Sequence, residues 1–188
     1  MLERTIVYFE EPGNKNTDEV FRIARQRAEE LHIETIVVAS ISGETAVRAM
    51  DALEGFRVVV VTHNTGYLEP NSQQCSPENA ASIRSKGGVL VTTTSALGGL
   101  SRAMGQTSLM PPGASYVVGD IVANALRILG QGVKVACEIA AMAADSGLVR
   151  TDEEIISIAG TNLGLDETAR GADTALVLQA ANVHQFFQ

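Results

Sequence analysis

Short runs of β-branched and other apolar residues recur along the chain, separated by segments whose apolar residues follow helical spacing. An uninterrupted apolar run is typical of a strand covered on both faces, as in a parallel sheet. Such runs predict strands at residues 5–9, 34–40, 56–62 and 87–93, and strand character returns at 154–160 and 172–180. Helices between the strands imply right-handed crossovers. We therefore expect an α/β fold with three layers, in which helices cover both faces of a mainly parallel sheet.

The segments between these runs predict helices. Apolar residues recur at helical spacing after Thr17, a candidate helix cap. Further helices are predicted over residues 46–53, near 77–86 and within the Ala-rich region 96–147. In that region, Met-Pro-Pro-Gly at 110–113 predicts a break, and Gly130 and Gly132 divide two helices.

Length and composition narrow the class of protein. A chain of 188 residues is long enough to bury a sizeable core, and we expect residues 1–188 to form a single domain. Hydrophobic residues make up 45% of the chain and charged residues 19%, which is typical of a globular protein. The formal net charge of −8, without a cluster of basic residues, argues against a nucleic-acid partner.

The sequence gives no sign of secretion or of membrane insertion. The first residues carry charges instead of a long apolar stretch. The most apolar later stretch, 133–147, contains three charged residues and is too short to span a bilayer. Cys75 and Cys137 lie far apart without companion ligands, which suits reduced thiols. We therefore expect a cytoplasmic protein.

The loop that follows the second predicted strand has the features of an anion site. The strand ends at Ser40 and the next helix starts near Glu44, so several backbone N–H groups there lack an intrahelical partner. The hydroxyls of Ser40, Ser42 and Thr45 add donors, and Gly43 permits close approach of a phosphate. The simpler alternative is that Ser42 only caps the helix.

Polar residues after three other predicted strands are expected at the same edge of the sheet, where ligands bind in doubly wound folds. They are Asn14 and Thr17, Thr62 and His63, and Gly160 and Thr161. His63 could donate to a phosphate or ring carbonyl or serve as an acid or base, although a hydrogen-bonded loop histidine is the plainer interpretation. For the other residues of this set, a purely structural role in a turn or a helix cap is the alternative to ligand binding.

Several catalytic signatures are missing from the sequence. We find no metal-ligand cluster, no nucleophile elbow and no paired catalytic carboxylates with convincing spacing. The dinucleotide fingerprint Gly-x-Gly-x-x-Gly does not follow the first predicted strand. The sequence therefore predicts no metal site, assigns no catalytic residue and leaves open whether the protein is an enzyme.

Two segments resemble the C-terminal domain of pyruvate kinase. Val-Val-Ala-Ser-Ile-Ser-Gly-Glu-Thr-Ala, at 37–46, and the strand that follows it are similar to a phosphate loop of that domain, and 156–161 is similar to a late strand and loop. In regulated forms, that loop holds a phosphate of a sugar-bisphosphate effector. The resemblance implies the same α/β fold. Residues 66–150 depart from it, and no kinase barrel, metal site or nucleotide site can be located, so pyruvate kinase activity is not implied.

A closer resemblance, over nearly the whole chain, is to stand-alone proteins that are similar to this domain. It rests on the opening at 9–17, the Ser-Gly-Glu-Thr-Ala loop and the closing segment at 160–175. That family is associated with flavin mononucleotide (FMN), which implies a flavoprotein whose flavin phosphate lies at Ser42 to Thr45. The loop at 160–171 would then close over the flavin ring or its ribityl chain.

Two other functions remain open at this point. The same Ser-Gly loop is similar to the phosphate loop of sugar isomerase domains, which suggests a sugar-phosphate enzyme or regulator. The earlier Gly- and Ser-rich loop of those domains is replaced here by Glu-Glu-Pro-Gly-Asn-Lys-Asn-Thr, which counts against an isomerase. The third reading is an allosteric or structural module that forms a homo-oligomer through its Ala-rich helices at 115–147.

Overall fold

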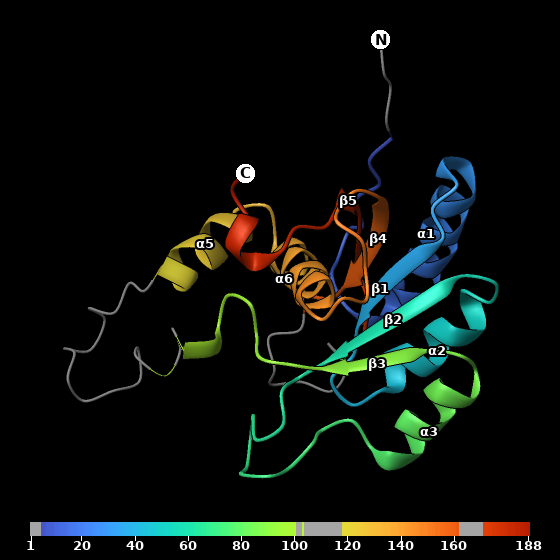
Figure 1. The fold of residues 1–188 in the computed structure, drawn as a ribbon. Helices are drawn as coiled ribbons and strands as arrows, with labels where there is room; N and C mark the ends of the chain where they lie inside the picture. Colours follow the sequence, from blue (N-terminus) through green and yellow to red (C-terminus); the bar gives the residue numbers. More distant parts are fainter. Residues whose placement is uncertain (1–4, 101–102, 104–117, 162–170) are drawn as a thin grey trace.

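The structure is a computed structural model that describes residues 5–100, 103, 118–161 and 171–188 (Figure 1). One sheet has the strand order β3-β2-β1-β4-β5. Its strands are β1 (Thr35–Ala39), β2 (Arg57–Thr62), β3 (Val89–Thr92), β4 (Glu154–Ala159) and β5 (Thr174–Gln179). Neighbouring strands are parallel except at the edge, where β5 is antiparallel to β4. The expected mainly parallel α/β sheet is confirmed.

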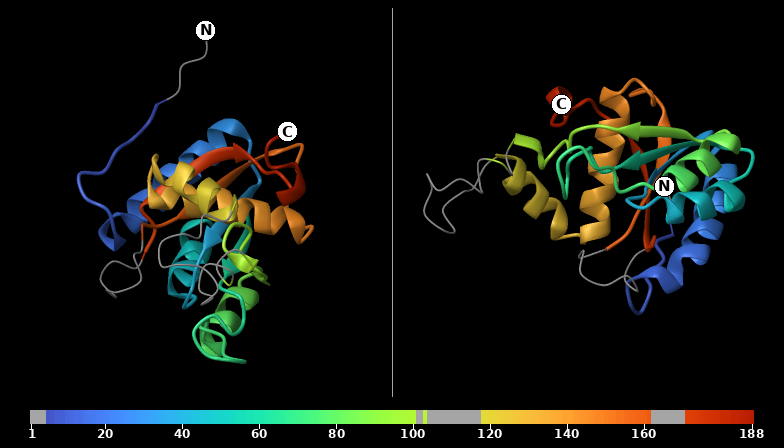
Figure 2. Two further views of the ribbon diagram at one scale, coloured as in Figure 1. Left: turned by 90° about the vertical axis from the view of Figure 1, so that its left-hand side faces the viewer. Right: turned by 90° about the horizontal axis from the view of Figure 1, so that it is seen from below.

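Helices cover both faces of this sheet (Figure 2). They are α1 (Thr17–Leu31), α2 (Glu44–Ala52), α3 (Pro77–Ser85), α5 (Val118–Arg127) and α6 (Gln131–Asp145), with 3-10 turns η1 (Asn14–Asn16) and η3 (Val183–Gln185). The first three helices pack on one face and α6 packs on the other, while α5 lies against the outer side of α6. No helix within the described ranges is long and apolar enough to cross a membrane.

The central strand β1 explains why the core has two halves. Val37 and Val38 are both fully buried, and because side chains alternate along a strand they face opposite layers. Val38 packs in the cluster that contains Phe21 of α1, whereas Val37 packs in the cluster that contains Ile139 and Ala143 of α6. An apolar run buried on both faces is what the sequence pattern predicted for this strand.

Residues 5–9 form no strand, so that prediction is wrong. The segment is extended without a ladder partner among the described residues, and Ile6 and Tyr8 are 71% and 85% exposed. Both sides of β1 are already occupied, by β2 and by β4. A β-branched run becomes a strand only where a pleated, half-buried surface is available to it. Phe9, which is half-buried, is the residue of this segment that packs on the core.

The two glycines of the Ala-rich region have different roles. Gly130 precedes α6 and separates it from α5, as expected. Gly132 lies inside the first turn of α6, where an added Cβ would come 2.0 Å from Thr174 Oγ1. Gly132 therefore permits close packing of α6 against β5 and does not divide helices. The predicted break at 110–113 lies outside the described residues.

Candidate functional site

The strand order places a topological switch point between β1 and β4. From β1 the chain moves through β2 to β3 on one side, and it then returns to β4 on the other side of β1. In doubly wound sheets, ligands bind at the carboxyl ends of the strands at such a point. Helices that connect parallel strands run antiparallel to them, so α2 and α6 both begin at this edge and direct the positive ends of their dipoles toward it.

The β1–α2 loop carries two hydroxyls that bind the first turn of α2, and it also carries unused backbone donors. Ser40 Oγ accepts from the N–H of Ala46 at 3.2 Å, and Ser42 Oγ accepts from the N–H of Glu44 at 3.4 Å. The N-cap residue of α2 is Gly43, so Ser42 is not the helix cap that the simpler alternative assumed, although both hydroxyls bind N–H groups of the first turn. The N–H groups of residues 41–43 and of Thr45 have no protein acceptor in the described part of the chain. These two hydrogen bonds therefore leave a row of backbone donors for a ligand.

Gly43 is explained by packing against α3. Its φ of 93° is left-handed, and an added Cβ would lie 2.6 Å from the Cβ of Asn79 and 3.0 Å from Cys75 Sγ. Asn79 Nδ2 donates to Ser42 O at 3.0 Å, and the N–H of Ser76 donates to the same oxygen at 3.3 Å. The beginning of α3 therefore holds the loop in place. This support was not predicted from the sequence, although Ser-Pro at 76–77 is a signal for the start of a helix.

Beside the β1–α2 loop, Asp173 brings together a second group of residues that were predicted to line the site. Its Oδ2 accepts from the N–H of Thr161 at 3.1 Å and from the N–H of Gly13 at 2.9 Å. Thr17, which is fully buried, donates to Ala172 O at 3.2 Å and accepts from the N–H of Ala172 at 3.0 Å. Residues 171–173 thus connect the beginning of α1 with the end of β4. Thr17 was predicted to follow a strand, but it reaches this edge of the sheet as the first residue of α1.

Asn14 and Gly160 complete this second group through close approaches to Gly171. An added Cβ on Gly171 would meet the Cα of Asn14 at 2.6 Å, and one on Gly160 would meet the carbonyl oxygen of Gly171 at 1.9 Å. Asp173 was not singled out from the sequence, although it lies within the quoted closing segment. Residues 162–170 of the loop expected to close over a ligand lie outside the described residues.

Thr62 and His63 form a third group at the end of β2. Thr62 is buried, and its hydroxyl lies 2.7 Å from that of Thr92 at the end of β3. His63 Nδ1 lies 2.7 Å from Gln74 Oε1, and its ring lies 4.0 Å from the ring of Tyr67. Because β1 lies between β2 and β4, the loop at Ser42 stands between this group and the Asp173 group.

A buried ion pair anchors the loop after β3 to α6. Lys134 and Glu138 form this pair, with side chains 7% and 8% exposed. Glu138 Oε1 also accepts from the Ser95 hydroxyl and from the N–H of Leu97, the latter at 3.0 Å. Burial raises the pKa of Glu138, but the Lys134 charge and these hydrogen bonds outweigh it and hold that pKa below its usual value. In the sequence, these two residues stand out only as charges that interrupt the apolar stretch at 133–147.

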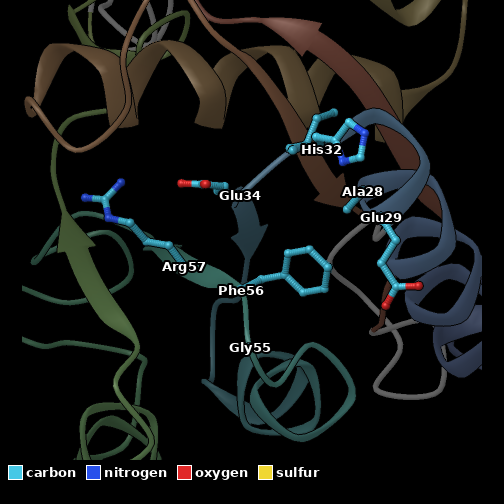
Figure 3. Close-up of a pocket in the computed structure, with 8 residues that line it drawn as sticks. Ala28, Glu29, His32, Glu34, Gly55, Phe56 and Arg57 are labelled. Carbon is cyan, nitrogen blue, oxygen red and sulfur yellow. The ribbon is translucent and has the colours of Figure 1, made fainter.

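Two shallow hollows lie at the opposite, amino edge of the sheet. The larger, of about 470 Å³, is lined by residues from the end of α1 and the beginning of β2 (Figure 3). Figure 3 shows Phe56 extending toward α1, whereas Glu34 and Arg57 extend in the opposite direction. The second hollow is lined by His32 and Glu34 and adds Glu153 and Glu154. Helix carboxyl ends and carboxylates gather here, so this edge is unsuited to an anion. None of the predicted site residues lines either hollow.

The described residues offer neither a metal site nor a reactive cysteine. The described ranges hold no group of three His, Cys, Asp or Glu side chains that could bind a metal ion. Burial raises the pKa of the Cys75 thiol, which Arg84 only partly offsets, and burial raises the pKa of Cys137 as well. Both cysteines are free thiols held in their protonated form, which is the less nucleophilic one.

The sequence profile of the family described as "Pyruvate kinase, alpha/beta domain" matches residues 18–178. The chain belongs to this family. The match to the pyruvate kinase alpha/beta domain includes the β1–α2 loop and the end of β4, whereas Asn14 and Thr17 precede it. The resemblance stated from the sequence is therefore confirmed at the level of that domain.

Solved structures of whole pyruvate kinases are similar to this chain over a minor part of their length. Two are structures of the enzyme from Cryptosporidium parvum, one of them in complex with ADP. They match 87% of this chain at 13% and 11% identity, each with a TM-score of 0.42. The chain covers 23% and 22% of those two proteins, so it spans less than a quarter of each.

Proposed function

We propose that the protein binds a phosphorylated ligand at the carboxyl edge of its sheet, and that this ligand is FMN. One observation carries the proposal: the N–H groups of residues 41–43 and of Thr45 have no acceptor in the described ranges and lie at the beginning of α2. Consecutive free amides at a helix N-terminus suit the oxygens of a phosphate. The Thr45 hydroxyl, for which no partner is found among the described residues, would add a donor.

The neighbouring groups fit the rest of a flavin. The His63 and Tyr67 rings lie at the end of the adjacent strand, and Tyr67 is 38% exposed, so an aromatic surface for a planar ring exists there. On the other side, Asp173 holds the N–H groups of Thr161 and Gly13 at the switch point. A bound flavin would supply redox chemistry, while these residues would bind and orient it.

We expect FMN to bind and the isosteric substitution Thr45→Val to weaken that binding by roughly 10-fold or more, because a hydrogen bond to a charged group is lost. The measurement is titration calorimetry with FMN and with riboflavin, preceded by the visible spectrum of the purified protein and mass analysis of any released ligand. Riboflavin lacks the phosphate, so its affinity should be lower in the wild type and unchanged by Thr45→Val. Gly43 is left unaltered, because its substitution would disturb the packing against Asn79.

Ser146→Ala is the matched control, since it removes a hydroxyl at the far end of α6. Equal affinity for FMN and riboflavin would contradict a phosphate site in the β1–α2 loop. A protein that binds no FMN but binds a sugar phosphate, in a manner sensitive to Thr45→Val, would instead establish the second candidate. The row of unused amides is common to both ligands, whereas the aromatic pair favours the flavin.

A further inference from the structure

Two donors at the beginning of α3 hold the carbonyl oxygen of Ser42, in the middle of the β1–α2 loop. Asn79 Nδ2 donates to this oxygen at 3.0 Å, and the N–H of Ser76 donates to it at 3.3 Å. A carbonyl oxygen only accepts, so the atom of the Asn79 amide that faces it is the nitrogen. Because both donors belong to α3, the Ser42 carbonyl is directed toward that helix.

The same peptide group carries the N–H of Gly43, which points the opposite way. The peptide bond between Ser42 and Gly43 is trans, so its C=O and its N–H are directed to opposite sides. The Gly43 N–H, one of the amides without an acceptor in the described ranges, therefore points away from α3. Figure 1 shows α3 beside β3, whereas the switch point lies on the other side of β1, next to β4. Holding the carbonyl toward α3 thus leaves the N–H available to a ligand.

The backbone of Gly43 does not by itself fix this orientation. Its φ is 93°, and glycine adopts φ of either sign at similar cost, so the Ser42–Gly43 peptide is able to turn over. A turned peptide would present the Ser42 oxygen to a phosphate in place of the Gly43 N–H, and the negative end of that dipole disfavours an anion. Packing nevertheless requires glycine here, because an added Cβ would lie 2.6 Å from the Cβ of Asn79. The Asn79 amide removes the freedom that this glycine introduces.

We propose that Asn79 is a positioning residue of the phosphate site, which keeps the Gly43 N–H directed at the phosphate of the bound ligand. This inference rests on the proposed function. Asn79→Ala is the variant that tests it, because alanine removes the amide but keeps the Cβ that packs against Gly43. The cap of α3 should survive the substitution, since it is the backbone N–H of residue 79 that donates to Ser76 Oγ, at 3.1 Å.

Two measurements distinguish positioning from a role in stability alone. In titration calorimetry, Asn79→Ala should raise the Kd for FMN by roughly 5-fold or more and leave the Kd for riboflavin unchanged, because one phosphate contact is weakened. In the ligand-free protein, residual dipolar couplings measured by NMR report the direction of each backbone N–H. The coupling of Gly43 should change in Asn79→Ala, while that of Val47, inside α2, should stay as in the wild type. A residue that only stabilises the fold would move neither the ratio of the two Kd values nor the Gly43 coupling.

Asn182→Ala is the matched control. Asn182 is also half-buried and also donates through Nδ2 at 3.0 Å, but its acceptor is Asp145 at the end of α6, on the opposite edge of the sheet, so its loss should change neither measurement. If the wild type binds FMN more tightly than riboflavin, and Asn79→Ala keeps either that preference or the Gly43 coupling unchanged, the positioning role is wrong while the phosphate site stands. If the wild type itself shows no preference for FMN over riboflavin, the phosphate site is wrong and the positioning role falls with it.

Discussion

Lys134→Met is expected to lower the free energy of unfolding by about 3–5 kcal/mol, because it leaves the buried Glu138 carboxylate without its counterion. Glu138 would keep the Ser95 hydroxyl and the N–H of Leu97, which cannot neutralise a charge. Urea unfolding at pH 7, followed by circular dichroism, measures this loss. Lys134→Met with Glu138→Gln should recover most of it, since the amide still accepts from Leu97 and no charge is buried.

Lys15→Met provides the matched control. Lys15 and Glu11 form the same type of pair at the same four-residue spacing, but their side chains are 59% and 73% exposed. Solvent screens such a pair, so its loss should leave unfolding almost unchanged. If Lys134→Met were as mild as Lys15→Met, the Lys134–Glu138 pair would not be the buried, mutually dependent unit that the structure shows.

The pH dependence of stability gives this prediction a second readout. In the wild type, the pKa of Glu138 is below its usual value, so the stabilisation is present above the unfolded pKa of about 4.3 and is lost as the pH falls through the lower folded pKa. Without Lys134, burial should raise that pKa above its usual value. The variant should then regain stability as the pH falls from neutral toward 4. The difference between the two proteins should therefore shrink on acidification.

Local patterns were sufficient to predict most of the fold. The runs that became β1, β2 and β4 are apolar because helices cover both faces, and a sequence shows such runs directly. The β1–α2 loop was located because a strand end, hydroxyls and a helix start are neighbours along the chain. The prediction of a strand at 5–9 was wrong because local pattern is not sufficient there. Whether a β-branched run becomes a strand also depends on a free sheet edge, which distant residues provide.

The parts of the candidate site that the sequence did not reveal depend on contacts between distant residues. Asp173 joins Gly13 to Thr161, and Asn79 supports Ser42 from 37 positions away. No periodicity marks such residues, because each forms one specific hydrogen-bonded contact and belongs to no repeating face. Lys134 and Glu138 were visible as charges at helical spacing, but their burial was not.

Gly160→Ala is the substitution expected to test how residues 171–173 close the switch point. Its Cβ would lie 1.9 Å from the Gly171 carbonyl oxygen, which is main chain and cannot rotate away. Residues 171–173 must then move, and Asp173 with them, so the N–H groups of Gly13 and Thr161 would lose their acceptor. We expect a loss of about 2–3 kcal/mol in the free energy of unfolding, as for other overpacked sites. Faster hydrogen exchange at both amides should accompany it.

Gly55→Ala is the comparison in which the added Cβ meets no other atom, so it carries backbone strain without a steric clash. Gly55 has a φ of 96° with nothing within 4 Å of an added Cβ, so its substitution should cost only the backbone strain of about 1–2 kcal/mol and leave exchange at Gly13 and Thr161 unchanged. If Gly160→Ala cost no more than Gly55→Ala and left both amides protected, residues 171–173 would be free to adjust. The contact between Gly160 and Gly171 would then not be what fixes the Asp173 group at the end of β4.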